Sequence, residues 1–145
     1  MNLKDLNRFS LETDIHATGG MTVSVFQLED KKGVQAGTQR QTNVVSLVSD
    51  GKNEEGATKN GIDFVLEVLE GLKDHAEIVK VGIRELVKEP NGDLFNAVVQ
   101  VGLFDKSEEG ADLIKKKGFG FGKHKDMKKA QQEAIESALR LMGEK

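Results

Sequence analysis

Residues 115–145 read KKKGFGFGKHKDMKKAQQEAIESALRLMGEK, which combines a glycine-phenylalanine segment, a basic turn and a helical pattern. Glycine and phenylalanine alternate over residues 118–122. In an extended chain this alternation carries Phe119 and Phe121 on one face and leaves bare backbone on the other. The segment therefore predicts a strand whose glycine face lets a neighbouring element approach closely.

The segment after this strand predicts a helix that packs on a sheet. Asp126 is placed as its N-cap, and Gly143 supplies a C-terminal stop. Small and apolar residues recur between them at helical spacing. They are Met127, Ala130, Ala134, Ala138 and Leu141. Such a ridge can lie tightly on bare backbone, so the strand and the helix form one predicted unit.

The rest of the chain repeats this order of elements. Alternating apolar residues and turn signals predict strands at 21–28, 43–49, 53–58, 78–87, 95–104 and 113–122, and a first helix opening after Asn60-Gly61. We therefore predict an α+β fold of two tandem βββα units with a mainly antiparallel sheet. The helices would cover one face of the sheet and leave the other available for self-association.

The predicted domain boundaries follow from this order. Residues 1–20 are expected to form an N-terminal arm or a short helix, because apolar side chains there recur three residues apart up to Phe9. Residues 21–145 are expected to form one domain, with a first unit at 21–76 and a second at 77–145.

Composition narrows the classes of function. The 145 residues contain no cysteine, which excludes disulfide frameworks, thiolate metal sites and cysteine nucleophiles. We find neither a membrane-spanning run nor a secretory signal, so we expect a soluble cytoplasmic protein. The net charge of -3 argues against a generally basic nucleic-acid binder.

No enzyme constellation is present in the pattern. His16, His75 and His124 are far apart and lack the spacing of metal ligands. No carboxylate pair is marked as acid and base, and no serine sits in a nucleophile elbow. We therefore expect a protein without catalytic residues, metal or cofactor.

The glycines favour a small-ligand pocket as one function. A helix N-terminus offers N–H groups and a positive dipole end to a carboxylate or phosphate. Two predicted helix starts could line one such site. The candidate ligand-binding residues are Asn60, Gly61, Asp63, Gly120, Gly122 and Asp126. In the simpler structural interpretation, the glycines only allow close packing.

The lysines favour nucleic-acid binding as another function. Cations would contact phosphates and phenylalanines would stack on bases. The candidate residues are Lys115, Lys116, Lys117, Phe119, Phe121, Lys123, Lys125, Lys128 and Lys129. In the simpler interpretation, the lysines are solvated and the phenylalanines belong to the core.

Residues 43–142 resemble the C-terminal regulatory domain of the isopropylmalate and citramalate synthases. The resemblance rests on Asp50-Gly51 and Asn60-Gly61 in the first half, and on Gly120-Phe121-Gly122 followed by Asp126-Met127 in the second. It implies dimerisation or a larger homo-oligomer and binding of a branched-chain amino acid. A stand-alone, non-catalytic regulatory domain is thus the first functional hypothesis.

The second half also resembles Rad52-type single-strand annealing proteins and, more loosely, double-stranded-RNA-binding domains. The glycine- and lysine-rich turn and the run Lys129-Ala130-Gln131-Gln132-Glu133-Ala134 carry this resemblance. It implies nucleic-acid binding through residues 115–129. The position of Phe119 and Phe121 separates the two hypotheses: outward-facing rings beside the lysines favour nucleic acid.

Overall fold

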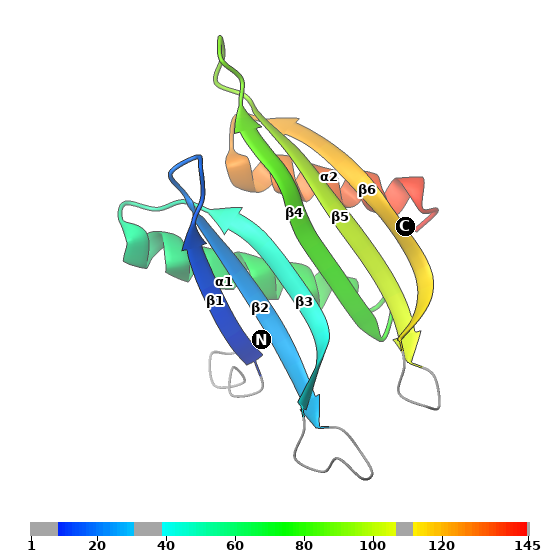
Figure 1. The fold of residues 1–145 in the computed structure, drawn as a ribbon. Helices are drawn as coiled ribbons and strands as arrows, with labels where there is room; N and C mark the ends of the chain where they lie inside the picture. Colours follow the sequence, from blue (N-terminus) through cyan, green and yellow to red (C-terminus); the bar gives the residue numbers. More distant parts are fainter. Residues whose placement is uncertain (1–8, 31–38, 107–111, 145) are drawn as a thin grey trace.

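The computed structural model describes residues 9–30, 39–106 and 112–144 of the chain. The elements in order are β1 (Phe9–Ile15), β2 (Met21–Asp30), β3 (Gln39–Ser49), α1 (Glu54–Leu72), β4 (Ile78–Lys88), β5 (Phe95–Lys106), β6 (Asp112–His124) and α2 (Met127–Leu141). The strands form one six-stranded sheet in the order β1-β2-β3-β4-β5-β6. Figure 1 shows both helices on the same face of this sheet. The predicted α+β class is confirmed.

Most neighbouring strands of the sheet are antiparallel, but β3 and β4 run parallel. Their pairing is short and joins Val44 to Lys80, Val45 to Val81 and Ser46 to Gly82. On either side of this contact the two strands diverge, as Figure 1 shows. The two halves of the sheet are therefore joined through a short central ladder.

Two side-chain amides extend this ladder at its ends. Gln131 of α2 is fully buried, and its Nε2 donates to the carbonyl of Val48 at 2.7 Å. Its Oε1 accepts from the Val48 amide at 2.8 Å. At the other end, Oδ1 of Asn43 accepts from the Val79 amide at 2.7 Å. Because buried backbone groups need partners, these amides stabilise the junction where strand pairing stops.

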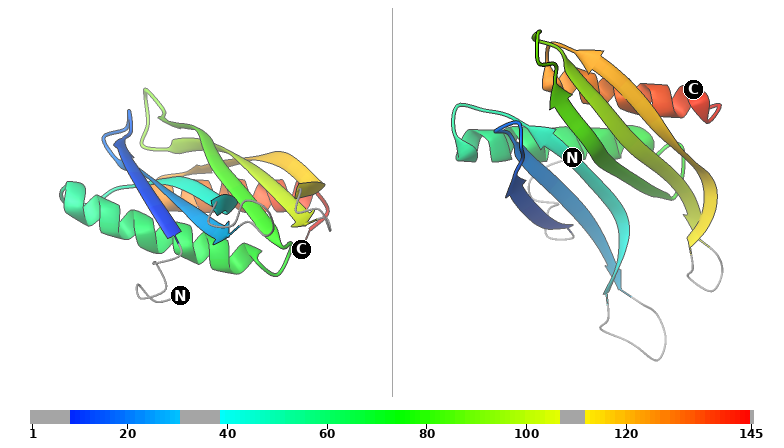
Figure 2. Two further views of the ribbon diagram at one scale, coloured as in Figure 1. Left: turned by 60° about the horizontal axis from the view of Figure 1, so that its bottom comes forward. Right: turned by 45° about the horizontal axis from the view of Figure 1, so that its top comes forward.

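The core lies between the sheet and the two helices. From α1 it receives Phe64, Val65 and Leu69, and from α2 it receives Ala134 and Ala138, all buried. α1 packs mainly on β2 and β3, whereas α2 packs mainly on β6 and β5. Figure 2 shows the two helices in one layer beneath the sheet, which leaves the opposite face without a covering element in the described part of the chain.

The strand expected at 53–58 is wrong, because α1 already begins at Glu54. Asn53 is its N-cap, with a side chain that accepts from the Gly56 amide at 2.8 Å. Asn60-Gly61 therefore lies inside the helix and does not open it. The Asn60 side chain donates instead to the carbonyl of Asp50 at 2.9 Å. The Asn-Gly pair was a misleading turn signal, since the Asn53 cap decides where the helix starts.

The N-terminal segment contributes a strand to the sheet. β1 pairs antiparallel with β2 from Phe9 opposite Gln27 to Ile15 opposite Met21. Residues 9–15 thus form a strand docked on the sheet and not a helix; residues 1–8, where the apolar spacing suggested a helix, lie outside the described residues. β1 is an exposed edge strand. Its sequence FSLETDI does alternate apolar and polar residues, but the helical spacing of apolar residues up to Phe9 outweighed this strand pattern in the prediction.

The remaining predicted elements are confirmed, with ends that differ by a few residues. Asp126 is the N-cap of α2, and its carboxylate accepts from the amides of Lys128 and Lys129. Gly143 follows the helix with a φ of 79°, a conformation that suits glycine. Neither α1 nor α2 is long and apolar enough to cross a membrane.

Candidate functional site

The glycine face of β6 is filled by α2. A Cβ on Gly120 would lie 1.7 Å from the carbonyl oxygen of Ala134, and a Cβ on Gly122 would lie 2.0 Å from that of Ala130. No side chain fits there. The amides at the start of α2 are bonded to the Asp126 carboxylate. The bare backbone therefore serves helix packing, and the helix N-terminus is already capped.

The other predicted ligand-binding residues lie on α1 and face different neighbours. Gly61 packs against β2, where a Cβ would lie 2.3 Å from Cγ2 of Val23. Asp63 is exposed. Gly61 and Gly120 lie against different parts of the sheet, because α1 packs mainly on β2 and β3 and α2 mainly on β6 and β5. The start of α2 meets α1 through Lys128, which contacts Glu67 and the Phe64 ring.

The phenylalanines of β6 face away from the helices. Phe119 is 48% exposed and Phe121 is 63% exposed, although both are large apolar side chains. They alternate with Gly120, which contacts α2, so they stand on the uncovered face of the sheet. Phe119 lies opposite Gln100 of β5, and Phe121 lies opposite Val98.

Cations surround these rings on the same face. Lys117 and Lys123 flank the phenylalanines along β6 and are exposed. Lys117 lies opposite Gly102, which in turn lies opposite Lys80 of β4. Nε of Arg84 donates to Oε1 of Gln100 at 3.0 Å. Because Gln100 lies opposite Phe119, this hydrogen bond holds the guanidinium close to the ring. We call Lys80, Arg84, Lys117, Phe119, Phe121 and Lys123 the open-face patch.

The other lysines predicted for nucleic-acid binding point elsewhere. Lys116 pairs with Glu144 after α2 at 3.5 Å. Lys128 pairs with Glu67 of α1 at 3.3 Å, and its Nζ also lies 5.3 Å from the centre of the Phe64 ring. These two cations belong to the helix layer, as does Lys129, which is on α2. The lysine-rich segment is therefore divided between the two faces of the sheet.

Two further lysines lie at the ends of the sheet. Nζ of Lys115 donates to the carbonyl of His75, between α1 and β4, at 3.0 Å. Lys125 pairs with Asp93, in the hairpin between β4 and β5, at 3.6 Å. Both contacts are exposed, so neither restrains its lysine strongly. Of the seven lysines between 115 and 129, only Lys117 and Lys123 join Phe119 and Phe121.

Lys80 and Arg84 were missed by sequence reasoning because they lie far from the lysine-rich segment. A signal was present in the strand Ile78–Lys88, IVKVGIRELVK. There Val79 and Val81 alternate with Lys80, so one face of β4 was already marked as polar and cationic. What the sequence could not show is that β4 lies two strands from β6.

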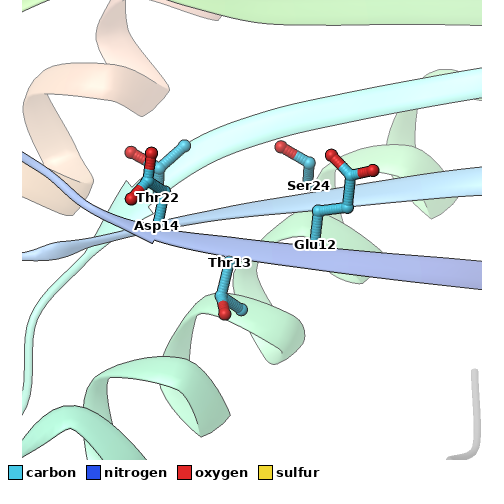
Figure 3. A pocket seen from close by; sticks show the side chains of 5 residues that line it. All are labelled: Glu12, Thr13, Asp14, Thr22 and Ser24. Atoms are coloured by element: carbon cyan, nitrogen blue, oxygen red, sulfur yellow. The ribbon is translucent and has the colours of Figure 1, made fainter.

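The opposite end of the uncovered face is acidic. Figure 3 shows Glu12 and Asp14 of β1 pointing away from the helices, whereas Thr13 points toward them. With Thr22 and Ser24 of β2 the two carboxylates line a shallow hollow. The uncovered face is thus acidic at β1 and basic and aromatic at β6.

One carboxylate lies at the border of the open-face patch. Glu89 accepts from Nζ of Lys123 at 2.7 Å and from Nδ2 of Asn96 at 3.3 Å. The hydrogen bond from Lys123, followed by that from Asn96, lowers the pKa of Glu89 below its ordinary value. Glu89 therefore stays ionised near neutral pH and orients the Lys123 ammonium group.

The described residues hold no cluster of three or more histidine, aspartate or glutamate side chains that could bind a metal ion. Comparisons with protein-family models, curated proteins and solved structures find no match for this chain. Its function must therefore be argued from the arrangement of its own side chains.

Proposed function

We propose that this protein binds single-stranded nucleic acid through the open-face patch. The observation that carries this proposal is the exposure of Phe119 and Phe121 on the uncovered face, beside Lys117 and Lys123. Stacking aromatic rings on a sheet surface next to cations is a common way of holding unpaired bases and their phosphates.

The spacing of the two rings suits the stacking of two successive bases of one strand. Residues two apart on one face of a strand stand about 7 Å apart. Phe119 and Phe121 can therefore each present a separate ring to successive unstacked bases. Each base-aromatic contact of this kind contributes about 1–3 kcal/mol and tolerates any base. Weak sequence preference is the expected consequence.

The position of the cations supports a backbone path beside the rings. Lys80 and Lys117 stand on either side of Gly102, and the ring of Phe104 lies over the glycine, where a side chain would otherwise be. Nζ of Lys80 lies 5.0 Å from the centre of the Phe104 ring, so this ammonium group is held over the sheet surface. Because Glu12 and Asp14 occupy the far edge, we expect phosphates to remain over β4, β5 and β6.

The direct test is fluorescence anisotropy with labelled single- and double-stranded oligonucleotides across a salt series. We expect tighter binding of the single strand and an affinity that falls as salt rises, because phosphate contacts release counterions. Absent binding, or binding that does not depend on salt, would rule the proposal out.

Matched variants test whether the two phenylalanine rings contribute to binding. Phe119→Ala and Phe121→Ala should each weaken single-strand binding about 5- to 150-fold, which corresponds to about 1–3 kcal/mol. Leu113→Ala is the control, because Leu113 is also exposed on β6 but lies outside the patch. An equal loss in all three variants would contradict a stacking role for the phenylalanines.

A second pair of variants tests which lysine contacts the phosphates. Lys117→Gln should reduce the slope of log affinity against log salt by about one phosphate contact. Lys116→Gln is its control, because the neighbouring side chain lies on the helix side and pairs with Glu144. A slope that changes equally in both variants would place the phosphates elsewhere.

The branched-chain amino-acid hypothesis remains a prediction with less support. It required a pocket shared by two helix starts, whereas Gly61 is buried inside α1 and Gly120 lies beneath α2. Calorimetric titration with leucine, isoleucine and valine tests it. Heat of binding from any of them would revive a regulatory role.

We also infer that the fold consists of two equivalent βββα units. In the first unit Thr13, Val23 and Leu47 form one row across the strands, and Ile83, Val99 and Gly120 form the matching row in the second. The N-caps Asn53 and Asp126 follow Leu47 and Gly120 at the same distance along the chain. This common register supports the inference, although the sequence shows no obvious self-similarity.

A further inference from the structure

Apart from Val87 of β4, the large exposed apolar side chains of the sheet lie on its two edge strands. On β1 they are Leu11 and Ile15, and on β6 they are Leu113, Ile114, Phe119 and Phe121. Within the described residues both strands have a neighbour on one side only. An edge strand with exposed apolar residues is a template for pairing with another strand.

Comparison of equivalent strands in the two units shows that the edge strand β1 lacks a neighbour that β4 has. The row Leu11, Val25 and Val45 in the first unit corresponds to Val81, Val101 and Gly118 in the second. Val81 is 2% exposed, because β4 is covered by β3 on its other side. Leu11 is 38% exposed at the equivalent position of β1. β1 is therefore built like β4 but has no strand in the place of β3.

We propose that β6 of one copy of this protein pairs in parallel with β1 of a second copy, repeating the junction between β3 and β4. In the two-unit register, β6 corresponds to β3 and β1 corresponds to β4. The pairs of the internal junction then predict those between copies: Lys117 with Ser10, Gly118 with Leu11, and Phe119 with Glu12. This inference rests on the two-unit description and not on base stacking, although Lys117 and Phe119 belong to both proposed surfaces.

The charges of the two edges are complementary. β1 presents Glu12 and Asp14 on the uncovered face, and β6 presents Lys117 and Lys123 on the same face. In the proposed register Glu12 is diagonal to Lys117 across the new pair. Two copies of β1, or two copies of β6, would instead place like charges together. Charge therefore favours β6 against β1 over either strand against itself.

The internal junction also shows why the contact between copies should be weaker. Gln131 clamps both backbone groups of Val48 at the internal junction. The residue at the equivalent position of α1 is Thr58, whose shorter side chain cannot reach both groups. Asn43 supports the other end of the internal ladder, where β6 has Lys116. We therefore expect assembly that depends on protein concentration.

A contact between different edges is heterologous, so it continues from copy to copy until a ring closes or a filament grows. The sheet would become continuous through the assembly. The uncovered face would stay accessible, because neighbours add at the edges and not on the face. The open-face patch of each copy would then lie next to the β1 strand of its neighbour.

The test is the molar mass of nuclease-treated full-length protein, measured by light scattering or mass photometry over a concentration series. We expect mass to rise beyond a dimer with concentration. Leu11→Lys should return the protein to monomers, because it places a charge where the neighbour's strand would cover it. Val87→Lys is the control, since Val87 is 47% exposed on β4 but is not at either edge of the sheet.

Charge-reversal variants test whether β1 of one copy pairs with β6 of another. Glu12→Lys and Lys117→Glu should each weaken assembly alone, and a mixture of the two variants should restore it. The control Glu70→Lys carries the same charge change on the exposed surface of α1 and should assemble normally. Circular dichroism checks that each variant is folded.

Three results would overturn the proposal: monomers at every concentration, assembly that Leu11→Lys leaves unchanged, or failure of the mixed variants to reassemble. None of these depends on nucleic acid. Conversely, a Leu11→Lys monomer that still binds single strands would separate assembly from the proposed function.

Discussion

At the residue scale, a glycine allows each helix to pack closely on the sheet. In one contact the glycine belongs to the helix, and in the other it belongs to the strand. In the first half the helix provides it: Gly61 of α1 lies against Val23 and Ser49. In the second half the strand provides it: Gly120 lies beneath Ala134 of α2. Both solutions remove a Cβ from the same layer, so helix and sheet can pack closely.

Gly120→Ala is expected to destabilise the fold strongly. Its Cβ would lie 1.7 Å from a helix carbonyl oxygen, which is backbone and cannot turn aside. The helix would have to move, at a cost of about 3 kcal/mol or more. Urea denaturation measures the free energy of unfolding. Gly82→Ala is the matched control, because a Cβ at Gly82 meets no atom within 4 Å; similar losses in both variants would contradict this packing.

The pKa of Glu89 should lie below that of an ordinary glutamate, because Lys123 and Asn96 donate to its carboxylate. A lowered pKa in the folded state stabilises the protein above the pKa of the unfolded state. That contribution disappears as the pH falls through the folded pKa. An NMR pH titration should show the lowered value, and Lys123→Gln should raise it. An unchanged Glu89 titration in Lys123→Gln would show that the ion pair is not formed in solution.

At the scale of elements, the joint between β3 and β4 depends on a helix side chain. Gln131→Leu should destabilise the protein, because the amide and carbonyl of Val48 lose their buried partners. Each unsatisfied group costs about 1–3 kcal/mol. Hydrogen exchange at the Val48 amide should accelerate, and thermal denaturation should report the loss.

Gln132→Leu is the control for this joint, since it changes the neighbouring residue of α2, which is only partly buried. Its stability should stay close to that of the unaltered protein. Protection of the Val48 amide that survives Gln131→Leu would mean that another group bonds it.

The elements with the clearest patterns were predictable from the sequence. Residues 118–122 and the Asp126 cap defined β6 and α2, because strand alternation and capping act over a few residues. β1 was not predicted, although FSLETDI alternates apolar and polar residues, because the three-residue apolar spacing up to Phe9 favoured a helix. The start of α1 was misplaced because Asn60-Gly61 resembles a turn, whereas tertiary packing of Gly61 holds it inside a helix.

The candidate site was predictable only in part. Phe119, Phe121, Lys117 and Lys123 could be assigned to one face by alternation within β6. Lys80 could not be added, because its distance from β6 depends on the order of strands in the sheet. The residue pattern of one strand predicts which side chains share a face of that strand. Which strands contribute to one binding surface depends on their order in the sheet.

At the scale of the whole molecule, the two faces of the sheet differ in what they can do. One face is buried beneath α1 and α2 and forms the core. The other is uncovered in the described chain and changes from acidic at β1 to basic and aromatic at β6. This separation allows a protein with a net charge of -3 to offer a local cationic surface.

The central claim is that this uncovered face binds single strands. NMR chemical-shift mapping during titration with a short oligothymidine tests it most directly. The account predicts shifts at the amides of Lys117, Phe119, Phe121 and Gln100, with little change at Ala134 and Ala138 of α2. Shifts confined to the helix layer, or no shifts in low salt, would contradict it.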